Sequence, residues 1–271
     1  MMLAEKYLRD AMMPHMWCPG CGHGIILQAV IRAIDKAGLE HDKTVIVSGI
    51  GCSSRASGYM NFDTLHTTHG RALPFASGIK MANPDLNVIV LTGDGDALAI
   101  GGNHFIHACR RNIDITTVIF NNSIYGMTSG QYSPMTPVGQ FATTSPYGNI
   151  DRNFDVCELA KSAGATYVAR STAYHAPSMP DLIVKAINNK GFSVVEAVGQ
   201  CPTYYGRRNK LGSPVDMLNW QKEHAVNVAA AAHLTPEQLA DKLIIGELHN
   251  SSAPEFTEKY DQLVARLQGR E

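Results

Sequence analysis

Two side chains that carry oxygen ligands, those of Asp94 and Asn122, are the clearest sign of chemistry in this sequence. Asp94 lies between Gly93 and Gly95, and a backbone without Cβ atoms can approach a phosphate closely. Carboxylate and amide oxygens suit Mg²⁺, which takes few protein ligands and completes its shell with phosphate oxygens. The two positions therefore predict a magnesium–diphosphate site, provided that the fold brings them together.

The surrounding residues predict the elements that would bring them together. Residues 88–92 form a short apolar run rich in β-branched side chains, as in a strand buried on both faces, and residues 115–120 repeat that pattern. Between them, residues 101–111 are expected to form a helix that ends in a basic pair. A right-handed crossover would place the carboxyl ends of both strands at one edge of the sheet, where open α/β sheets bind ligands. A βαβ unit with two turn-forming caps is the plainer interpretation of the same residues.

The rest of the chain predicts an α/β fold with a mostly parallel sheet and helices on both faces. Residues 123–147 are rich in Gly, Ser, Thr and Pro and follow Asn122, so we expect an active-site loop there. Residues 1–210 are expected to form the main domain, and residues 211–271 a mostly helical extension that contacts another subunit. Further strands are expected at 44–48, 166–170 and 192–197, and further helices at 25–37, 72–81, 155–163 and 178–189.

Four of the six cysteines lie in predicted loops, and two lie among apolar residues of predicted helices, where free cysteine is often buried. Two of the loop cysteines form a CxxC pair, and the other two follow the ends of predicted strands, at the edge that carries Asp94. Such a set suits either a structural zinc ion or an iron–sulfur cluster, and its spacing alone does not decide between them. The loop cysteines are Cys18, Cys21, Cys52 and Cys201, and the helix cysteines are Cys109 and Cys157.

Five motifs stand out in combination: WCPGCGHG, the GIGCSS loop, HGRALPFASGIK, GDGDALAIGGNHFIHACRRNIDITTVIFNNSIYGMT and a late Cys-Pro pair. The GDG…NN part is similar to the diphosphate-binding motif of thiamine diphosphate (ThDP) enzymes in general. Together the motifs resemble those of the β subunits of 2-oxoacid:ferredoxin oxidoreductases, with the 2-oxoglutarate type as the best match. The resemblance covers about residues 15–210.

The resemblance implies ThDP, Mg²⁺ and one [4Fe–4S] cluster as cofactors. An electron-accepting cluster beside ThDP suits an oxidative decarboxylation, which favours iron and sulfur over zinc. The implied cluster ligands are Cys18, Cys21, Cys52 and Cys201, and the implied Mg²⁺ ligands are Asp94, Asn122 and the carbonyl group of Ile124. The residues implied around ThDP are Ile50, Gly51, Cys52, Ser53, His69, Gly95, Asp96, Tyr125, Gly126, Met127 and Thr128.

The implied reaction converts a 2-oxoacid, CoA and oxidised ferredoxin into an acyl-CoA, CO₂ and reduced ferredoxin, and its reverse is a CO₂ fixation. ThDP enzymes also need a glutamate that activates the cofactor, and the chain has room for only one ThDP-type unit. An α subunit is therefore expected to supply this glutamate, in an αβ or (αβ)₂ assembly. The chain alone is expected to be inactive.

Two further side chains are candidates for catalysis. His69 is expected to hydrogen-bond to the substrate carboxylate or to developing negative charge, unless it is a surface histidine. Arg55 lies in the same loop as Cys52, and a guanidinium group pairs well with a carboxylate. Our hypothesis is that Arg55 helps to select 2-oxoglutarate over pyruvate, and the alternative is a solvated surface arginine.

Composition and charge exclude several classes of protein. Hydrophobic residues make up 45% of the 271 residues and charged residues 17%, which fits a globular protein with a substantial core. The net charge of −1 gives no reason to expect a nucleic-acid partner. No apolar run is long enough to span a bilayer, and the N-terminal residues do not resemble a leader, so we expect a cytoplasmic protein away from membranes.

The sequence also fits two other functions. A non-oxidative ThDP-dependent decarboxylase or synthase subunit would share GDG…NN and would hold a structural zinc ion in the cysteines, so iron content separates it from the first interpretation. A zinc-stapled binding module for another phosphate ligand would contain zinc and no ThDP.

Overall fold

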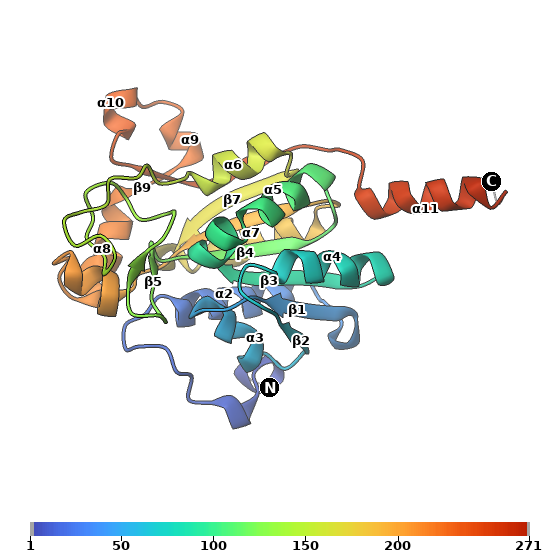
Figure 1. The fold of residues 1–271 in the computed structure, drawn as a ribbon, viewed down its shortest axis with the longest axis horizontal. Helices are drawn as coiled ribbons and strands as arrows, with labels where there is room; N and C mark the ends of the chain where they lie inside the picture. Colours follow the sequence, from blue (N-terminus) through green and yellow to red (C-terminus); the bar gives the residue numbers. More distant parts are fainter. Residues whose placement is uncertain (1–2, 270–271) are drawn as a thin grey trace.

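The computed structural model of the protein describes residues 3–269 and is built around one eight-stranded sheet (Figure 1). The strand order is β2-β1-β3-β4-β8-β7-β10-β9, and the first six strands of this order are parallel. β10 runs antiparallel to β7, and β9 pairs in parallel with β10 at the edge. The strands are β1 Thr44–Ser48, β2 Asp63–His66, β3 Asn87–Gly93, β4 Thr116–Asn121, β7 Tyr167–Thr172, β8 Ser193–Val198, β9 Ala225–Asn227 and β10 Leu243–Asn250.

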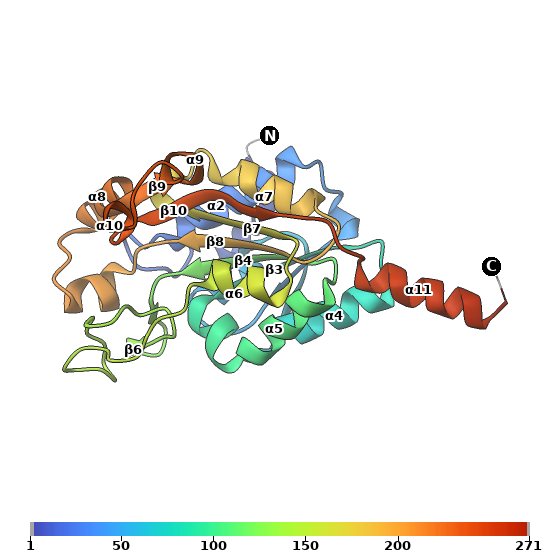
Figure 2. The same cartoon turned by 90° about the horizontal axis from the view of Figure 1, so that it is seen from above.

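Helices cover both faces of the sheet, which confirms the predicted fold class (Figure 2). α2 and α7 pack together on one face, whereas α4, α5 and α6 lie on the other. The central strands β3, β4 and β8 are buried almost throughout, which explains their continuous apolar sequences. The helices are α1 Leu3–Tyr7, α2 His23–Lys36, α3 Ala56–Tyr59, α4 Ala72–Ala82, α5 Gly102–Arg111, α6 Val156–Ala163, α7 Met179–Asn188, α8 Pro214–His224, α9 Val228–Ala231, α10 Pro236–Leu239 and α11 Phe256–Leu267.

The predicted loop after Asn122 is irregular, and backbone hydrogen bonds hold it in shape. It opens with a small antiparallel hairpin of β5, Ile124–Tyr125, and β6, Gln131–Tyr132. Further along, the N–H of Thr143 donates to the carbonyl of Gly130 at 2.7 Å. The loop is therefore a defined structure that lies directly beyond the end of β4.

The C-terminal extension contains strands as well as the helices expected there. β10 pairs with β7 in the main sheet, with a register shift between Glu247 and His249. Most of β10 is only half-buried, so its residues do not form the continuous apolar run that marked the central strands. The division of the chain at residue 210 stays a prediction.

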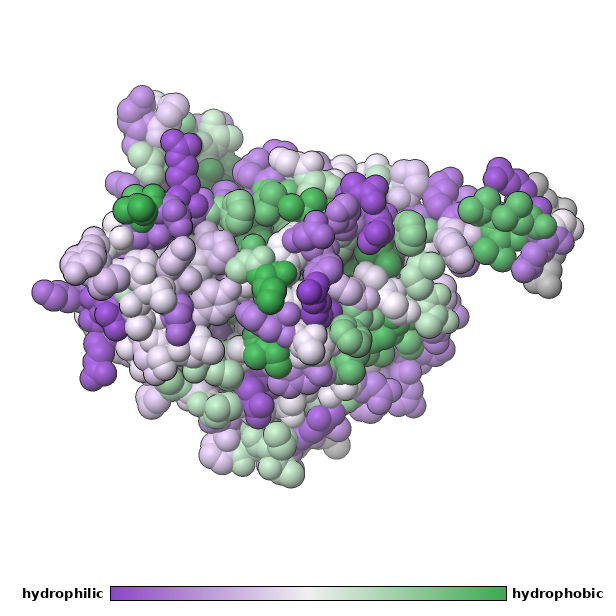
Figure 3. Space-filling view, viewed as in Figure 1, coloured by the Kyte–Doolittle hydropathy of each residue, from purple (hydrophilic) through white to green (hydrophobic). Residues whose placement is uncertain are grey.

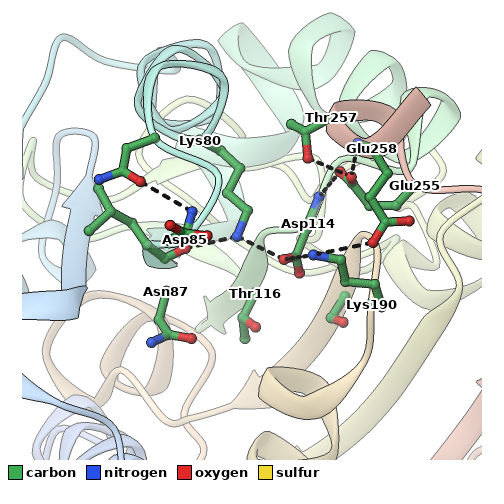
Figure 4. A network of polar contacts seen from close by, with 12 residues as sticks. Lys80, Asp85, Asn87, Asp114, Thr116, Lys190, Glu255, Thr257 and Glu258 are labelled. Atoms are coloured by element: carbon green, nitrogen blue, oxygen red, sulfur yellow. Dashed lines mark hydrogen bonds and ion pairs between the residues drawn. The ribbon is translucent and has the colours of Figure 1, made fainter. Parts of the chain in front are cut away.

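A polar network at the amino ends of the strands ties the extension to the body (Figure 4). The Lys80 side chain is buried, and its Nζ lies 2.7 Å from Oδ2 of Asp114 and donates to the carbonyl of Leu86 at 2.8 Å. The N–H of Asp114 donates to Oε1 of Glu255 at 2.9 Å, just before α11 begins. These buried charges are paired, so this edge of the sheet has a structural role.

The last helix, α11, projects away from the body (Figures 1 and 2). It exposes apolar side chains that include Tyr260, Leu263 and Leu267, and Figure 3 shows apolar atoms gathered on this helix. Among residues 3–269, no helix combines the length and apolar character that a membrane crossing requires.

Candidate active site

The predicted site residues gather where four neighbouring parallel strands end. β1, β3, β4 and β8 lie side by side, and they lead into the segments that carry Cys52, Asp94, Asn122 and Cys201. A cavity of about 150 Å³ opens at this edge. Its lining comprises His23, Ile50, Gly51, Cys52, Ser53, His69, Gly93, Asp94, Gly95, Asp96, Phe120, Asn122, Ile124, Tyr125, Gly126, Met127 and Thr128.

Asp94 is a buried carboxylate in the cavity lining. It is 3% exposed, and Oγ of Ser133 donates a hydrogen bond to its Oδ2. Among the described residues no basic side chain forms an ion pair with it, and burial raises the pKa of Asp94 to about 7. A buried carboxylate in this state fits a divalent cation, because the cation would supply the missing positive charge.

Asn122 and Ile124 lie beside Asp94 at the end of β4. Oδ1 of Asn122 accepts a hydrogen bond from the N–H of Ile124 at 3.3 Å, which curls the chain back toward the cavity. The preceding residue, Asn121, points elsewhere and donates to Oε1 of Glu196 at 2.7 Å. Of the two adjacent asparagines, only Asn122 lines the cavity, as the motif implied.

Asp96 ties three segments together beneath the cavity. Its carboxylate accepts hydrogen bonds from the backbone N–H groups of Ile50 at 3.2 Å and Gly70 at 2.7 Å, and from Oγ1 of Thr92 at 2.7 Å. Nδ1 of His69 also donates to Oδ1 of Asp96, at 2.5 Å. Asp96 therefore lines the cavity as predicted, and its carboxylate is occupied in fixing the loops after β1 and β2.

His69 is oriented by this bond. With the proton on Nδ1, a neutral imidazole keeps Nε2 as a bare acceptor. The ring also contacts the edge of the Tyr125 ring, with centroids 5.9 Å apart. His69 is thus held in place at the cavity and is not a loose surface histidine.

The hairpin of β5 and β6 closes the cavity over the GDG turn. The hydroxyl of Tyr125 donates to the carbonyl of Gly95 at 2.9 Å. A Cβ atom at Gly95 would overlap the Tyr125 ring, so this position accepts only glycine without a rearrangement. From the sequence, glycine at position 95 was expected to let the backbone approach a phosphate. Packing against the Tyr125 ring is a second reason for glycine at this position.

The four loop cysteines converge next to this cavity. A Cβ atom at Gly126 would lie 3.3 Å from Sγ of Cys52 and 3.8 Å from Sγ of Cys201. The charges of Cys18, Cys52 and Cys201 act on Cys21, and together with burial, the larger cause, they raise the pKa of Cys21 to about 12. Within residues 3–269, no three His, Cys, Asp or Glu side chains are placed to hold a single metal ion.

The loops that carry the cysteines are fastened to one another. The N–H of Gly22 donates to the carbonyl of Gln200 at 3.0 Å, and Nε2 of Gln200 donates to the carbonyl of Gly20 at 3.0 Å. Nε1 of Trp17 donates to the carbonyl of Cys52 at 2.7 Å. The other two cysteines, Cys109 and Cys157, are buried in α5 and α6, which confirms their predicted place in the core.

Arg55 and three of the loop cysteines, Cys18, Cys21 and Cys201, lie outside the cavity lining, and three lining or contacting residues were not predicted. Arg55 is half-buried in the turn after Cys52, and its Nε has no hydrogen-bond partner. His23 and Phe120 line the cavity, and Ser133 bonds to Asp94. Of these three, only His23 had a sequence signal, because it directly follows the CPGCG run. Burial lowers the pKa of His23 to about 4, so its ring is neutral at pH 7.

Comparison with known proteins assigns the chain to a family. Residues 49–197 match the family described as thiamine pyrophosphate enzyme, C-terminal TPP binding domain. The chain is 51% identical over 265 residues to 2-oxoglutarate synthase subunit KorB of Methanothermobacter marburgensis, which covers 98% of this chain and 93% of that protein. The KorB subunit of Archaeoglobus fulgidus is 53% identical, with 95% and 92% covered. The chain belongs to the 2-oxoglutarate synthase KorB family.

A solved structure supports the KorB assignment. The chain matches the 2-oxoglutarate:ferredoxin oxidoreductase from Magnetococcus marinus, determined with 2-oxoglutarate, coenzyme A and succinyl-CoA bound, with a TM-score of 0.88 and 35% identity. The match covers 98% of this chain and 91% of that chain. The resemblance drawn from the motifs is confirmed. The M. marburgensis subunit and the solved structure each match 98% of this chain, so the similarity includes the C-terminal extension.

Proposed function

We propose that the chain is the β subunit of a 2-oxoglutarate:ferredoxin oxidoreductase. The enzyme would convert 2-oxoglutarate and CoA into succinyl-CoA and CO₂ and would pass two electrons, one at a time, to ferredoxin; the reverse reaction would fix CO₂. The observation that carries the proposal is the convergence of Asp94 and Asn122 with Cys52 and Cys201 at one strand-end cavity. A ThDP subunit that catalyses no redox reaction would not need Cys52 and Cys201 beside the cofactor.

The cavity residues suit ThDP held through Mg²⁺. Asp94, the side-chain oxygen of Asn122 and the carbonyl of Ile124 would bind the ion, and Gly93 and Gly95 would admit the diphosphate. When bound, ThDP supplies the nucleophilic carbon and the electron sink for decarboxylation. The protein's part is to hold Mg²⁺, exclude water with the hairpin of Tyr125 and keep His69 in one orientation.

His69 and Asp96 form a positioning pair at this site. Because Nδ1 of His69 donates to Asp96, Nε2 of the neutral ring can accept a hydrogen bond from a ligand, and the expected bond to a carboxylate or to developing negative charge would need the protonated ring. The Asp96 carboxylate also accepts hydrogen bonds from the backbone N–H groups of Ile50 and Gly70 and so holds both loops in place. The two loops that face the ligand are therefore fixed before it binds, which lowers the ordering cost of binding.

The four thiols suit a [4Fe–4S] cluster, which would accept electrons beside ThDP. They come from three loops at one edge, and Gly126 packs closely against the sulfur atoms of Cys52 and Cys201. Their position beside the predicted ThDP site, where an electron acceptor is needed, favours the cluster over the zinc alternative.

The cavity lacks one group that the reaction needs. Its described lining includes Asp94 and Asp96 and no glutamate. An α subunit would supply the glutamate that activates ThDP, and the active form would be αβ or (αβ)₂. The exposed apolar face of α11 and the C-terminal extension are available for subunit contacts.

Charge around the cysteines suits ferredoxin as the electron acceptor. No Asp or Glu occurs in residues 11–34 or 197–215, which carry three of the four thiols. Arg207, Arg208 and Lys210 are exposed in the second of these segments. A basic face beside the cluster would steer an acidic electron carrier. All six cysteines are free thiols, which suits the reducing cytoplasm.

Metal and cofactor analysis of the anaerobically purified complex with its α subunit tests the proposal. We expect four irons and one ThDP per chain, a reduced [4Fe–4S]⁺ signal in low-temperature EPR, and ferredoxin reduction that requires both 2-oxoglutarate and CoA. Zinc in place of iron would contradict the proposal and favour a non-oxidative ThDP subunit. Zinc without ThDP would favour a binding module.

Arg55 provides a separate test of substrate choice. We expect Arg55→Ala to lower kcat/KM for 2-oxoglutarate relative to pyruvate about tenfold to hundredfold, because a charge-assisted bond to the distal carboxylate would be lost. Steady-state kinetics with both acids measure this ratio. Arg32→Ala, an exposed arginine on α2, is the matched control. An unchanged ratio in Arg55→Ala would assign Arg55 a structural or solvated role.

A further inference from the structure

His23 is a buried polar side chain without a partner at the cavity. It is 1% exposed, lines the cavity, and its Nδ1 has no hydrogen-bond partner. An unpaired buried polar group costs about 1–3 kcal/mol, and native proteins avoid such groups. The ring nitrogen is therefore expected to bind a group that fills this part of the cavity.

Aromatic neighbours hold the His23 ring in one place. The ring meets Trp17 edge-on, with centroids 5.8 Å apart, and Phe120 edge-on at 5.3 Å. Trp17 in turn holds the carbonyl of Cys52 through its indole N–H. The ring cannot swing to a partner elsewhere without displacing these contacts, so its partner must come to it.

The position of His23 points to the cysteine side of the cavity. It begins α2 two residues after Cys21, and its backbone N–H interacts with the thiol of Cys21. The Trp17 side chain that packs on it belongs to the same loop and contacts Cys52. The diphosphate end of the cavity has its own partners in Asp94 and Asn122.

We propose that the His23 ring donates a hydrogen bond to a sulfur of the iron–sulfur cluster and thereby raises its reduction potential. The inference rests on the proposed function, because it needs the cluster to be present. Hydrogen bonds to cluster sulfurs stabilise the more negative, reduced state. His23 would be a positioning and tuning residue that helps the cluster to accept electrons.

A redox titration followed by EPR on the anaerobic complex tests this role. We expect His23→Phe to lower the ratio of reduced to oxidised cluster at a fixed potential about tenfold, which is 59 mV for one electron. Iron and ThDP contents should stay unchanged. His15→Phe is the matched control, because His15 also contacts Trp17, with centroids 5.0 Å apart, but is exposed. His23→Gln keeps an N–H donor and should retain most of the potential.

A second measurement tests the proposal even if His23→Phe does not fold. Pulsed EPR of the wild-type complex should detect a histidine nitrogen coupled to the reduced cluster, and this coupling should be absent in His23→Gln and present in His15→Phe. Full iron content with an unchanged potential in His23→Phe, or no such coupling in the wild type, would overturn the role of His23 and leave the proposed function standing. A wild-type complex without iron would overturn the proposed function as well.

Discussion

Replacing Asp94 with alanine is expected to abolish retention of Mg²⁺ and ThDP. The carboxylate is buried, forms no ion pair with a basic side chain of residues 3–269 and lies next to Asn122 and Ile124, so its loss removes the one charged group among the predicted Mg²⁺ ligands. Truncating one partner of a buried charge pair costs about 2–5 kcal/mol, which lowers affinity at least about thirtyfold. ThDP content after purification and isothermal titration with ThDP and Mg²⁺ measure the effect.

Asp96 provides the matched control for Asp94. The two carboxylates are equally buried, but Asp96 is bonded to His69 and to the backbone of Ile50 and Gly70. In the cofactor-free chain, Asp96→Ala should therefore lower the melting temperature, whereas Asp94→Ala should leave it unchanged or raise it, because it removes an unbalanced buried charge. Normal ThDP content in Asp94→Ala would contradict the metal site assigned here.

The sequence predicted the central part of the fold well, for a physical reason. Strands buried on both faces must be apolar throughout, so residues 88–92 and 115–120 mark β3 and β4 almost to the residue. All the predicted strands and helices before residue 200 are present, with ends within two residues of those expected. The strand ends in turn place Asp94, Asn122 and Cys52 together, because parallel strands end at one edge.

Long-range contacts from irregular segments lay beyond sequence reasoning. Ser133 bonds to Asp94 from a loop with no periodic pattern, and only the folded hairpin brings it there. β10 joins the sheet as a half-buried strand with a positive φ at Gly246 and a register shift between Glu247 and His249. His23 had a sequence signal in the CPGCG run, but its burial between Trp17 and Phe120 depends on three separate elements.

Asp96 shows that the position of a side chain in a motif leaves its role open. The motif placed Asp94 and Asp96 together around ThDP, and both line the cavity. Only the folded structure shows that the Asp96 carboxylate is already bonded to His69, Thr92, Ile50 and Gly70. Identical side chains two residues apart thus divide into a candidate ligand and an anchor.

Replacing Cys52 with alanine is expected to remove the iron and to stop ferredoxin reduction while ThDP stays bound. Cys52 is one of the four implied ligands, and its Sγ lies close to Gly126, as does Sγ of Cys201. Burial raises the pKa of the Cys52 thiol to about 11, so thiolate is unfavourable here unless a metal compensates its charge. Iron analysis, EPR and ferredoxin-linked turnover of the αβ complex measure the loss, which should exceed about hundredfold in turnover.

Cys109→Ala separates this effect from the simple loss of a cysteine. Cys109 is buried in α5 among apolar residues, away from the cavity, so its truncation should cost about 1 kcal/mol of stability and leave iron unchanged. The backbone around Cys52 should survive its substitution, because Trp17 bonds to the carbonyl of Cys52 and not to its thiol. Full iron content in Cys52→Ala would contradict the cluster assignment. Loss of iron with retained ThDP would show that the two halves of the cavity bind their cofactors independently.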